Sequence, residues 1–213
     1  MIRKVLVIGE SGTGKSTSMR NLNSQETVIL KCLDKELPFK TRFKCINVEN
    51  AQMLIKYMQS FANNEKVKNI IIEDFIYLSV KSFFNKAKDK GYEKFMDLAV
   101  DVYSSLMCLE NKNIITRKEN NDLNVIFITQ SERDEGKSKV RSIGKAVDTK
   151  LKMEGLFSIV LESTVTNGEY EFKTHNCDDD SVCKSPMGMF ENDYIPNDLK
   201  YVIEGMDKYY NED

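Results

Sequence analysis

A short apolar segment followed at once by a glycine-rich motif constrains this chain more than any other feature of its sequence. The motif runs from Gly9 to Ser16 as GESGTGKS and fits the pattern G-x-x-x-x-G-K-S/T at every fixed position. Its glycines let the backbone curl so that successive N–H groups point inward, where they and the N-terminus of a following helix meet an anion. Thr17, Met19 and Leu22 indicate the start of that helix. The sequence therefore predicts a strand, a phosphate-binding loop and a helix in direct succession.

The residues of this motif have separate expected roles toward a bound nucleotide. Lys15 is expected to neutralise the β and γ phosphate oxygens, Ser16 to offer its hydroxyl to Mg²⁺, and Thr17 to lie near the α-phosphate. A glycine- and serine-rich turn without function is the alternative, but chance rarely places the whole motif between a strand and a helix. We therefore expect ATP and Mg²⁺ as ligands. The predicted nucleotide-binding residues are Gly9, Glu10, Ser11, Gly12, Thr13, Gly14, Lys15, Ser16 and Thr17.

A second apolar segment, Asn69 to Ile72, ends in two acidic residues, Glu73 and Asp74. In a fold with such a loop, a carboxylate at the tip of a strand beside the first one holds Mg²⁺ through water, and a neighbouring carboxylate can orient the attacking water. We expect Glu73 to serve the metal and Asp74 to serve the water, although the sequence alone does not separate these roles. An ordinary acidic strand end at the surface is the alternative interpretation.

A third apolar segment, Asn124 to Thr129, leads into Gln130 and then into a polar stretch that ends at Lys145. A polar side chain at the tip of that strand lies where a γ-phosphate sensor belongs, so Gln130 is expected to couple hydrolysis to the polar stretch after it. That stretch is typical of a solvated loop, of a contact to nucleic acid, or of a finger that reaches the nucleotide of a neighbouring subunit. The candidates for the last two roles are Arg133, Lys137, Lys139, Arg141 and Lys145.

Apolar runs that alternate with amphipathic stretches predict an α/β fold with a mostly parallel sheet flanked by helices. The first five strands are nearly continuous in apolar residues, which indicates burial on both faces. The last two strands are separated by Asn167-Gly168, the strongest short hairpin signal, so the sheet is expected to end in an antiparallel hairpin. The expected strands are Lys4–Ile8, Thr27–Leu30, Phe43–Val48, Asn69–Ile72, Asn124–Thr129, Phe157–Thr164 and Tyr170–Thr174.

Helical spacing of apolar residues is clearest between Gly91 and Glu110, where one stripe is expected to pack in the core. A partly solvated helix is expected from Ser79 to Lys90, and another from Leu199 to Tyr210. Because no internal repeat or linker is visible, we expect a single domain over residues 1–213. The stripe of the first of these helices consists of Phe95, Leu98, Ala99, Val102 and Leu106.

Composition limits the partners and the compartment. The 213 residues are 41% hydrophobic, which is enough for one sizeable core. The formal net charge of −2 gives no general attraction to nucleic acid or to an anionic membrane, so such binding requires a local patch. Five cysteines, an odd number, indicate reduced thiols rather than a disulfide framework. The N-terminal apolar run reaches Glu10 too soon for a signal peptide, and we expect a soluble, cytoplasmic protein without a membrane partner.

In these residues the chain resembles the phage-encoded, AAA-type nucleotide-binding proteins, short RecA-like ATPases linked to single-strand annealing and recombination. The resemblance covers most of the chain, and only its first motif is highly specific. It implies a RecA-like P-loop core, ATPase activity, assembly into a homo-oligomer, contact with single-stranded DNA, a phage single-strand-binding protein as a further partner, and the host cytoplasm as location. The segments that carry it are GESGTGKST, IIIEDF, GYEKFMDLAVDVY, VIFITQ, KVRSIGKAVDTKLKMEGLFSIVL and KSPMGMFENDYIPNDL.

Two features depart from that family pattern. Its members often have Asp where Glu73 stands, and the longer carboxylate changes the reach toward Mg²⁺. The segment from His175 to Cys183 is also rich in possible zinc ligands, which are His175, Cys177, Cys183 and an aspartate. Its spacing lacks a C-x₂₋₄-C pair, and a solvated acidic loop explains it equally well.

Two other functions share the phosphate-binding loop. A small-molecule kinase, for a nucleoside or nucleotide, needs a mobile lid and usually several arginines around the transferred phosphate. The chain has few arginines, one of them Arg20 just after the loop, which disfavours this class. A nucleotide-dependent scaffold that binds ATP and barely hydrolyses it is the third class, and glutamate at position 73 keeps it open.

Overall fold

Apolar runs form the strands at the centre of the sheet, because a strand buried on both faces needs apolar side chains on both. The computed structural model describes residues 1–88, 91, 93–118, 120–142, 151–177 and 180–211. The strands are β1 (Ile2–Ile8), β2 (Thr27–Lys31), β3 (Lys44–Asn47), β4 (Asn69–Glu73), β5 (Leu123–Ile128), β6 (Ser131–Asp134), β7 (Lys137–Val140), β8 (Ile159–Thr166), β9 (Glu169–Lys173) and β10 (Tyr194–Pro196). The helices are α1 (Ala51–Ala62), α2 (Ile76–Asn85), α3 (Glu93–Met107) and α5 (Leu199–Asn211), with short 3₁₀ turns at η1 (Thr17–Met19) and η2 (Met153–Leu156).

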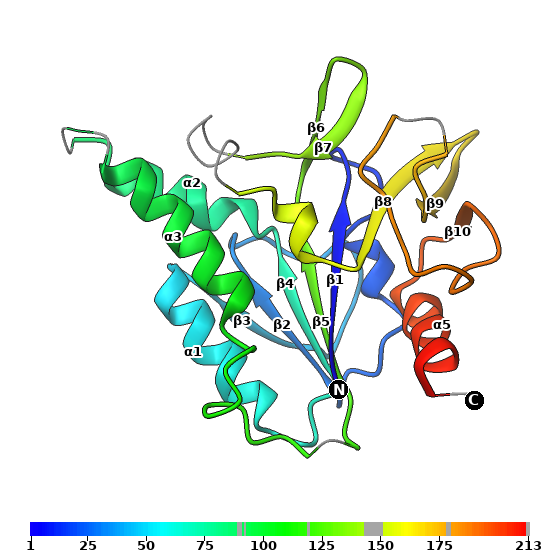
Figure 1. Ribbon diagram of the computed structural model, residues 1–213, viewed down its shortest axis with the longest axis horizontal. Helices are drawn as coiled ribbons and strands as arrows, with labels where there is room; N and C mark the ends of the chain where they lie inside the picture. The colour runs from blue at the N-terminus through cyan, green and yellow to red at the C-terminus, as the bar shows by residue number, and fades with distance from the viewer. Residues whose placement is uncertain (89–90, 92, 119, 143–150, 178–179, 212–213) are drawn as a thin grey trace.

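Eight of these strands form one sheet in the order β10-β9-β8-β1-β5-β4-β2-β3 (Figure 1). The pairs β8–β1, β1–β5, β5–β4, β4–β2 and β2–β3 are parallel, whereas β9 and β10 are antiparallel to their neighbours. These strand directions confirm the predicted α/β class, with a mostly parallel sheet and a C-terminal antiparallel hairpin. The carboxyl ends of the parallel strands, including β1, therefore meet at one edge of the sheet.

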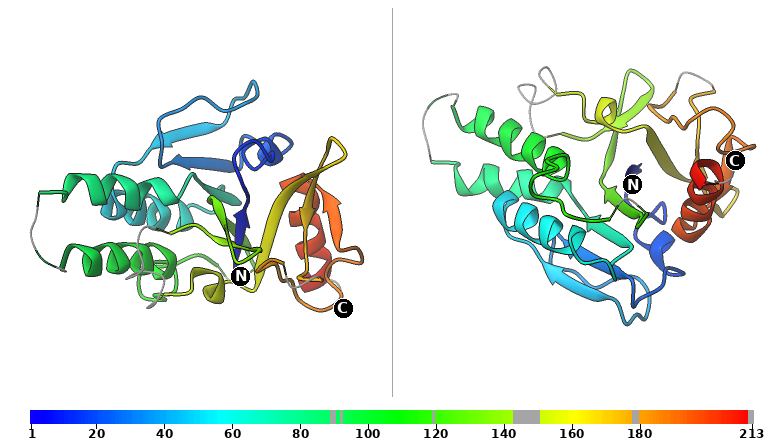
Figure 2. Two further views of the ribbon diagram at one scale, coloured as in Figure 1. Left: turned by 90° about the horizontal axis from the view of Figure 1, so that it is seen from above. Right: turned by 60° about the horizontal axis from the view of Figure 1, so that its bottom comes forward.

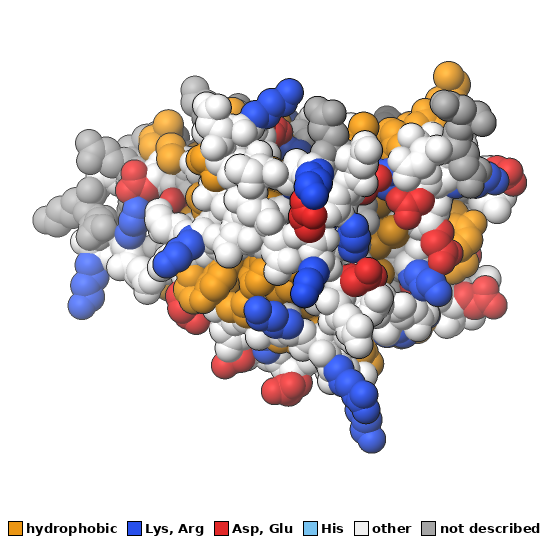
Figure 3. Space-filling view, turned by 90° about the horizontal axis from the view of Figure 1, so that it is seen from below, with side chains coloured by type: hydrophobic (Ala, Val, Ile, Leu, Met, Phe, Trp, Pro, Cys, Tyr) orange, Lys and Arg blue, Asp and Glu red, His pale blue; other side chains and the backbone are white. Residues whose placement is uncertain are grey.

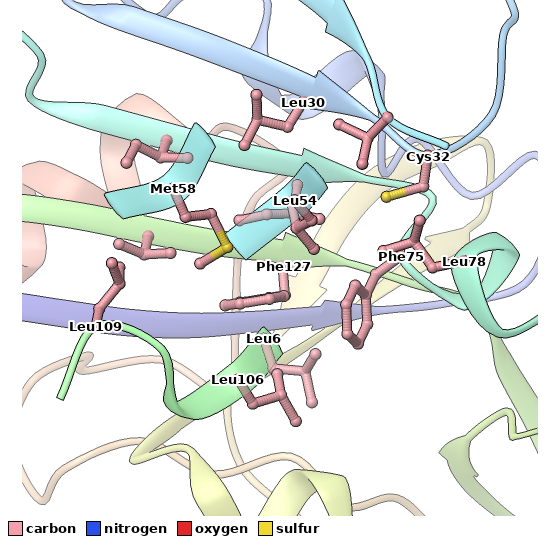
Figure 4. Packing of buried hydrophobic residues seen from close by; sticks show 14 of the residues in the cluster. Leu6, Leu30, Cys32, Leu54, Met58, Phe75, Leu78, Leu106, Leu109 and Phe127 are labelled. Carbon is pink, nitrogen blue, oxygen red and sulfur yellow. The ribbon is translucent and has the colours of Figure 1, made fainter. Parts of the chain in front are cut away.

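Helices cover both faces of the sheet (Figure 2). On one face, Leu6 of β1 packs in a cluster with Leu54 of α1 and Leu106 of α3, as Figure 4 shows. On the other face, Val7 of β1 belongs to a cluster with Val202 of α5. Neighbouring residues of β1 thus serve opposite cores, and this explains why its second half, from Val5 to Ile8, is apolar at every position.

The C-terminal hairpin forms at the predicted turn. Asn167 and Gly168 both have positive φ, +53° and +85°. This conformation is the one that a two-residue hairpin turn requires, because its twist matches that of the flanking strands. The hairpin joins β8 to β9 in antiparallel register, from Glu162 opposite Lys173 to Thr166 opposite Glu169.

Two expectations about local structure are wrong, and one helix was not predicted. The chain after the glycine-rich loop forms only the single 3₁₀ turn η1 and not a longer helix. The third strand, β3, is mostly exposed because it lies at the edge of the sheet and pairs only with β2. The helix α1 was not expected, yet Asn50 caps it, accepting a hydrogen bond from the Met53 amide at 2.8 Å.

The polar stretch that begins after Gln130 is a second hairpin, β6–β7, and not an irregular loop. Its turn residues, Glu135 and Gly136, both have positive φ. Figure 1 shows the hairpin projecting beyond the carboxyl edge of the sheet. Figure 3 shows the opposite end of the molecule, where acidic and basic side chains are interspersed. Within the part of the chain that the structure describes, no helix has the length and apolar character needed to cross a membrane.

Candidate functional site

A cavity of about 690 Å³ opens at the carboxyl edge of the sheet, beside the loop that follows β1. This volume lies in the range of small-molecule binding sites. Segments that follow β1, β2, β4 and β5 meet here with the C-terminal hairpin, because parallel strands end at the same edge. The lining residues are Ser11, Gly12, Gly14, Lys15, Ser16, Thr17, Arg20, Lys35, Glu36, Pro38, Asp74, Gln130, Tyr170, Pro196 and Asn197.

Lys15 is held inside the loop. Its side chain is buried, and Nζ donates a hydrogen bond to the carbonyl oxygen of Glu10 at 2.6 Å. Burial lowers the pKa of Lys15, while the nearby carboxylates of Glu73 and Asp74 act in the opposite direction. The ammonium group thus lies among groups of opposite charge and close to the place where the loop encloses an anion. The backbone at Gly14 supports this curvature with a φ of +91°.

Ser16 and Glu73 are in direct contact at the base of the cavity. The Ser16 hydroxyl donates a hydrogen bond to Oε1 of Glu73, which lies at the end of β4 and is buried. Oε2 of the same carboxylate is buried without a hydrogen-bond partner. Burial raises the pKa of Glu73 to about 7, and the hydrogen bond from Ser16 opposes this rise. The Ser16 hydroxyl and the Glu73 carboxylate, one oxygen of which has no partner, provide the hard oxygen ligands that Mg²⁺ prefers, so these residues fit that ion.

Asp74 follows Glu73 and turns into the cavity. It has a positive φ of +57°, which is uncommon for a residue other than glycine, and its side chain is buried. Oδ2 lies 2.5 Å from Nζ of Lys35, which comes from the loop after β2. Burial opposes the charge of Lys35, but the hydrogen bond and charge of Asp74 outweigh it, and the pKa of Lys35 is raised.

One expectation about this pair of acids is wrong. The strand that ends in Glu73 is not beside the first strand, because β5 lies between β1 and β4. The acid reaches the loop across the end of β5, and the glutamate side chain is long enough to contact Ser16 directly. Ser16 thus contacts this acidic strand end although the two strands are not neighbours.

Gln130 lies at the cavity wall, as expected for a side chain that follows β5. Its Nε2 donates to the Tyr77 hydroxyl at 3.2 Å, and its Oε1 accepts from Arg141 at 2.9 Å. Both ends of the amide are therefore held by groups from other segments. Arg141 follows the β6–β7 hairpin, so this contact links the cavity wall to the hairpin.

The basic residues of the β6–β7 hairpin stand among acidic ones. Arg133 reaches back to the phosphate-binding loop, with Nε 3.5 Å from Oε1 of Glu10. Lys139 forms ion pairs with Glu132 and Asp134 of the same hairpin. The hairpin is therefore less basic than its lysines and arginines alone suggest. Lys137 lies at the start of β7, and Lys145 lies outside the described residues.

The C-terminal hairpin is bonded to the back of the phosphate-binding loop. The Ser163 hydroxyl on β8 donates to the carbonyl oxygen of Thr13, and it accepts from Nδ2 of Asn197 at 2.8 Å. The Arg20 guanidinium donates to the carbonyl oxygen of Asn197 at 2.9 Å. Ser163 and Asn197 are both buried, so these bonds are shielded from water. They fix the loop against the β8–β10 segment.

Several of these residues were missed by the sequence interpretation. Lys35 and Glu36 lie in a loop whose approach to the cavity depends on β2 being next to β4. Ser163, Tyr170 and Asn197 are more than 140 positions from the glycine-rich motif, and their spacing gives no signal. The Asn167-Gly168 turn could have indicated that a hairpin returns toward this edge, but not which side chains it presents.

The possible zinc ligands that lie among the described residues do not gather into a site. Both ring nitrogens of His175 have hydroxyl partners, Thr174 at 2.8 Å and Ser185 at 2.9 Å. Cys183 is buried, and burial raises the pKa of its thiol to about 12, which disfavours the thiolate that binds metal. Among the described residues no group of three or more His, Cys, Asp or Glu side chains is arranged to hold a metal.

Comparisons with known proteins give matches only to solved structures. No family model matches the chain, and no curated protein matches it. Among solved structures it is similar to the KaiC-like protein PH0186 of the hyperthermophilic archaeon Pyrococcus horikoshii OT3, with 14% identity and a TM-score of 0.45 over 80% of this chain and 76% of that one. Conclusions about function therefore depend on the residues of the site itself.

Proposed function

We propose that this protein binds ATP with Mg²⁺ and hydrolyses it. The observation that carries the proposal is the convergence of Lys15, Ser16 and the Glu73–Asp74 pair at one cavity. This set provides a cation for phosphate oxygens, oxygen ligands for a metal, and a carboxylate at the cavity wall. Those are the parts that phosphoryl transfer to water requires.

Each residue has a defined part in the proposed reaction. The ammonium of Lys15 leaves the Glu10 carbonyl and contacts the β and γ phosphate oxygens. Ser16 and Glu73 would hold Mg²⁺, and the bound ion would supply positive charge to the phosphates. Asp74 accepts a hydrogen bond from the attacking water, and Gln130 contacts the γ-phosphate.

Phosphate release from MgATP tests this proposal. Asp74→Asn should lower turnover at least tenfold and retain ATP binding, because the amide orients water less well than the carboxylate. Asp34→Asn is the matched control, since Asp34 is an exposed aspartate of the loop after β2 and does not line the cavity. Equal turnover in Asp74→Asn and wild type would contradict the role of Asp74. ATP binding without turnover in wild type would favour the scaffold, and turnover only with a nucleoside acceptor would favour the kinase.

We propose a second function, in which a homo-oligomer binds single-stranded DNA under the control of ATP during recombination. The position of the β6–β7 hairpin supports this proposal. It projects next to the phosphate-binding loop and contacts it through Arg133 and Glu10. A change at the loop can therefore move the hairpin, whose basic residues bind a strand or a neighbouring subunit's nucleotide. A phage single-strand-binding protein is a further proposed partner.

Salt-dependent DNA binding tests this second function. If Arg133 and Lys137 each neutralise one phosphate, changing both to Ala should reduce the slope of log affinity against log salt by about 1.4, at about 0.7 per contact. ATP binding should be retained. An unchanged slope would place the DNA elsewhere, and no DNA binding by wild type in any nucleotide state would contradict the function.

A further inference from the structure

The cavity has two chemically different ends, one on each side of the phosphate-binding loop. The order of the sheet places β5, β4 and β2 on one side of β1 and β8, β9 and β10 on the other. The first side presents charged and polar groups, Lys35, Asp74 and Gln130. The second presents Tyr170, Pro196 and Asn197. A bound nucleotide must therefore run from a charged end to an end with an aromatic ring.

Tyr170 stands directly over the loop. A Cβ atom built on Gly14 would come 2.8 Å from Cδ1 of Tyr170, so the ring lies against the glycine backbone with no side chain between. Tyr170 as a whole is nevertheless 53% exposed. Tyr170 thus lines the cavity and keeps aromatic surface exposed there.

The backbone around Tyr170 is fixed from two directions. The carbonyl oxygen of Tyr170 accepts a hydrogen bond from the backbone N–H of Asn197 at 3.3 Å. Tyr170 also pairs with Val165 across the β8–β9 hairpin. Asn197 is in turn bonded to Ser163 through its side chain. The backbone that carries the ring is therefore held by the same bonds that fix the loop, so it needs no ordering when a ligand binds.

We propose that Tyr170 is the base-binding residue of this site and stacks on the purine of the nucleotide. The inference rests on the proposed function, because the metal-binding residues at the charged end fix the terminal phosphates there and leave the base to the opposite end. The side-chain amide of Asn197 donates to Ser163, and Nη1 of Arg20 donates to two carbonyl groups, so these two nitrogens are already bonded to the protein. Recognition of the base therefore comes mainly from the area of its ring that stacks on Tyr170. The larger purine is preferred to a pyrimidine for this reason.

A tryptophan placed at this position reports stacking directly, because the chain contains no tryptophan. In Tyr170→Trp, ATP should quench the fluorescence, whereas inorganic tripolyphosphate, which has no base, should bind without quenching. Tyr201→Trp is the matched control, since Tyr201 is a partly exposed tyrosine on α5 that does not line the cavity. Its fluorescence should not respond to ATP.

Binding affinities separate the base site from the phosphate site. Tyr170→Ala should weaken ATP about tenfold or more, the loss expected for one stacked base, and reduce the preference for ATP over CTP. Tripolyphosphate affinity should stay unchanged, and Tyr170→Phe should retain ATP affinity. Equal loss of ATP and tripolyphosphate would mean that the ring only supports the loop, and unchanged ATP affinity in Tyr170→Ala would also overturn the inference. Failure of wild type to bind either ligand would instead refute the proposed function.

Discussion

Replacing Glu73 by Gln should stabilise the protein in the absence of Mg²⁺ and nucleotide. Burial raises the pKa of this carboxyl from its ordinary 4.5 to about 7. Because the folded protein holds the proton more tightly than the unfolded chain does, the folded state has its full advantage below pH 4.5 and loses it as the pH rises through about 7. At about 1.4 kcal/mol per pKa unit, the raised pKa of Glu73 lowers the free energy of unfolding by about 3 kcal/mol at pH 8, where the buried group is charged, and by about 1 kcal/mol at pH 5, where it must take up a proton on folding. Glutamine removes this cost and can still accept the Ser16 hydrogen bond.

Urea unfolding at pH 5 and pH 8 in the presence of a chelator measures this difference. Glu73→Gln should have a higher free energy of unfolding than wild type at both pH values. This gain should be about 2 kcal/mol larger at pH 8 than at pH 5. Glu169→Gln, an exposed glutamate on β9, is the control and should show no such pH-dependent gain. If Glu73→Gln and Glu169→Gln showed the same change in the free energy of unfolding between pH 5 and pH 8, Glu73 would not be the buried carboxylate with a raised pKa that the site requires.

Two further predictions concern the contacts around the loop. Ser163→Ala should lower the free energy of unfolding by about 1–3 kcal/mol, because it leaves the Thr13 carbonyl and the Asn197 amide buried without that partner. Thr164→Val is the control, because the Thr164 hydroxyl is buried without a hydrogen-bond partner. It should leave the free energy of unfolding unchanged in the same urea assay. An equal loss in both variants would contradict a specific bond from Ser163 to the loop. Lys35→Ala should destabilise the nucleotide-free protein by about 1 kcal/mol, a small value because solvent screens the partly exposed Lys35. Lys35→Arg should restore stability in thermal unfolding, and no difference between Lys35→Ala and wild type would show that Asp74 does not need the cation.

The parts of the fold that the sequence predicted are those with local signals. Continuous apolar runs identify β1, β4 and β5, since such strands are buried on both faces. The Asn167-Gly168 pair identifies the hairpin because few residues adopt positive φ in succession. The glycine-rich motif likewise identifies its own loop. In each case the residues that carry the signal also make the structure.

The rest depends on contacts between distant segments. Helical spacing around Met19 and Leu22 suggested a helix, but both side chains are buried against the sheet while the chain forms only one 3₁₀ turn. Nothing near Lys35 indicates that it meets Asp74, because the contact follows from β2 pairing with β4. Tyr170 reaches Gly14 only because β8 lies beside β1. Strand order, which local spacing does not encode, assembles these parts of the site.

Calorimetric titration of the protein with MgATP tests the central claim, a nucleotide site built on Lys15, most directly. Wild type should bind one MgATP per chain, and Lys15→Ala should lose most of that affinity while circular dichroism shows an unchanged fold, because the buried ammonium contacts the ligand and its present bond is to the Glu10 carbonyl of the loop itself. Equal affinity in a folded Lys15→Ala variant, or no binding of MgATP by wild type, would contradict it.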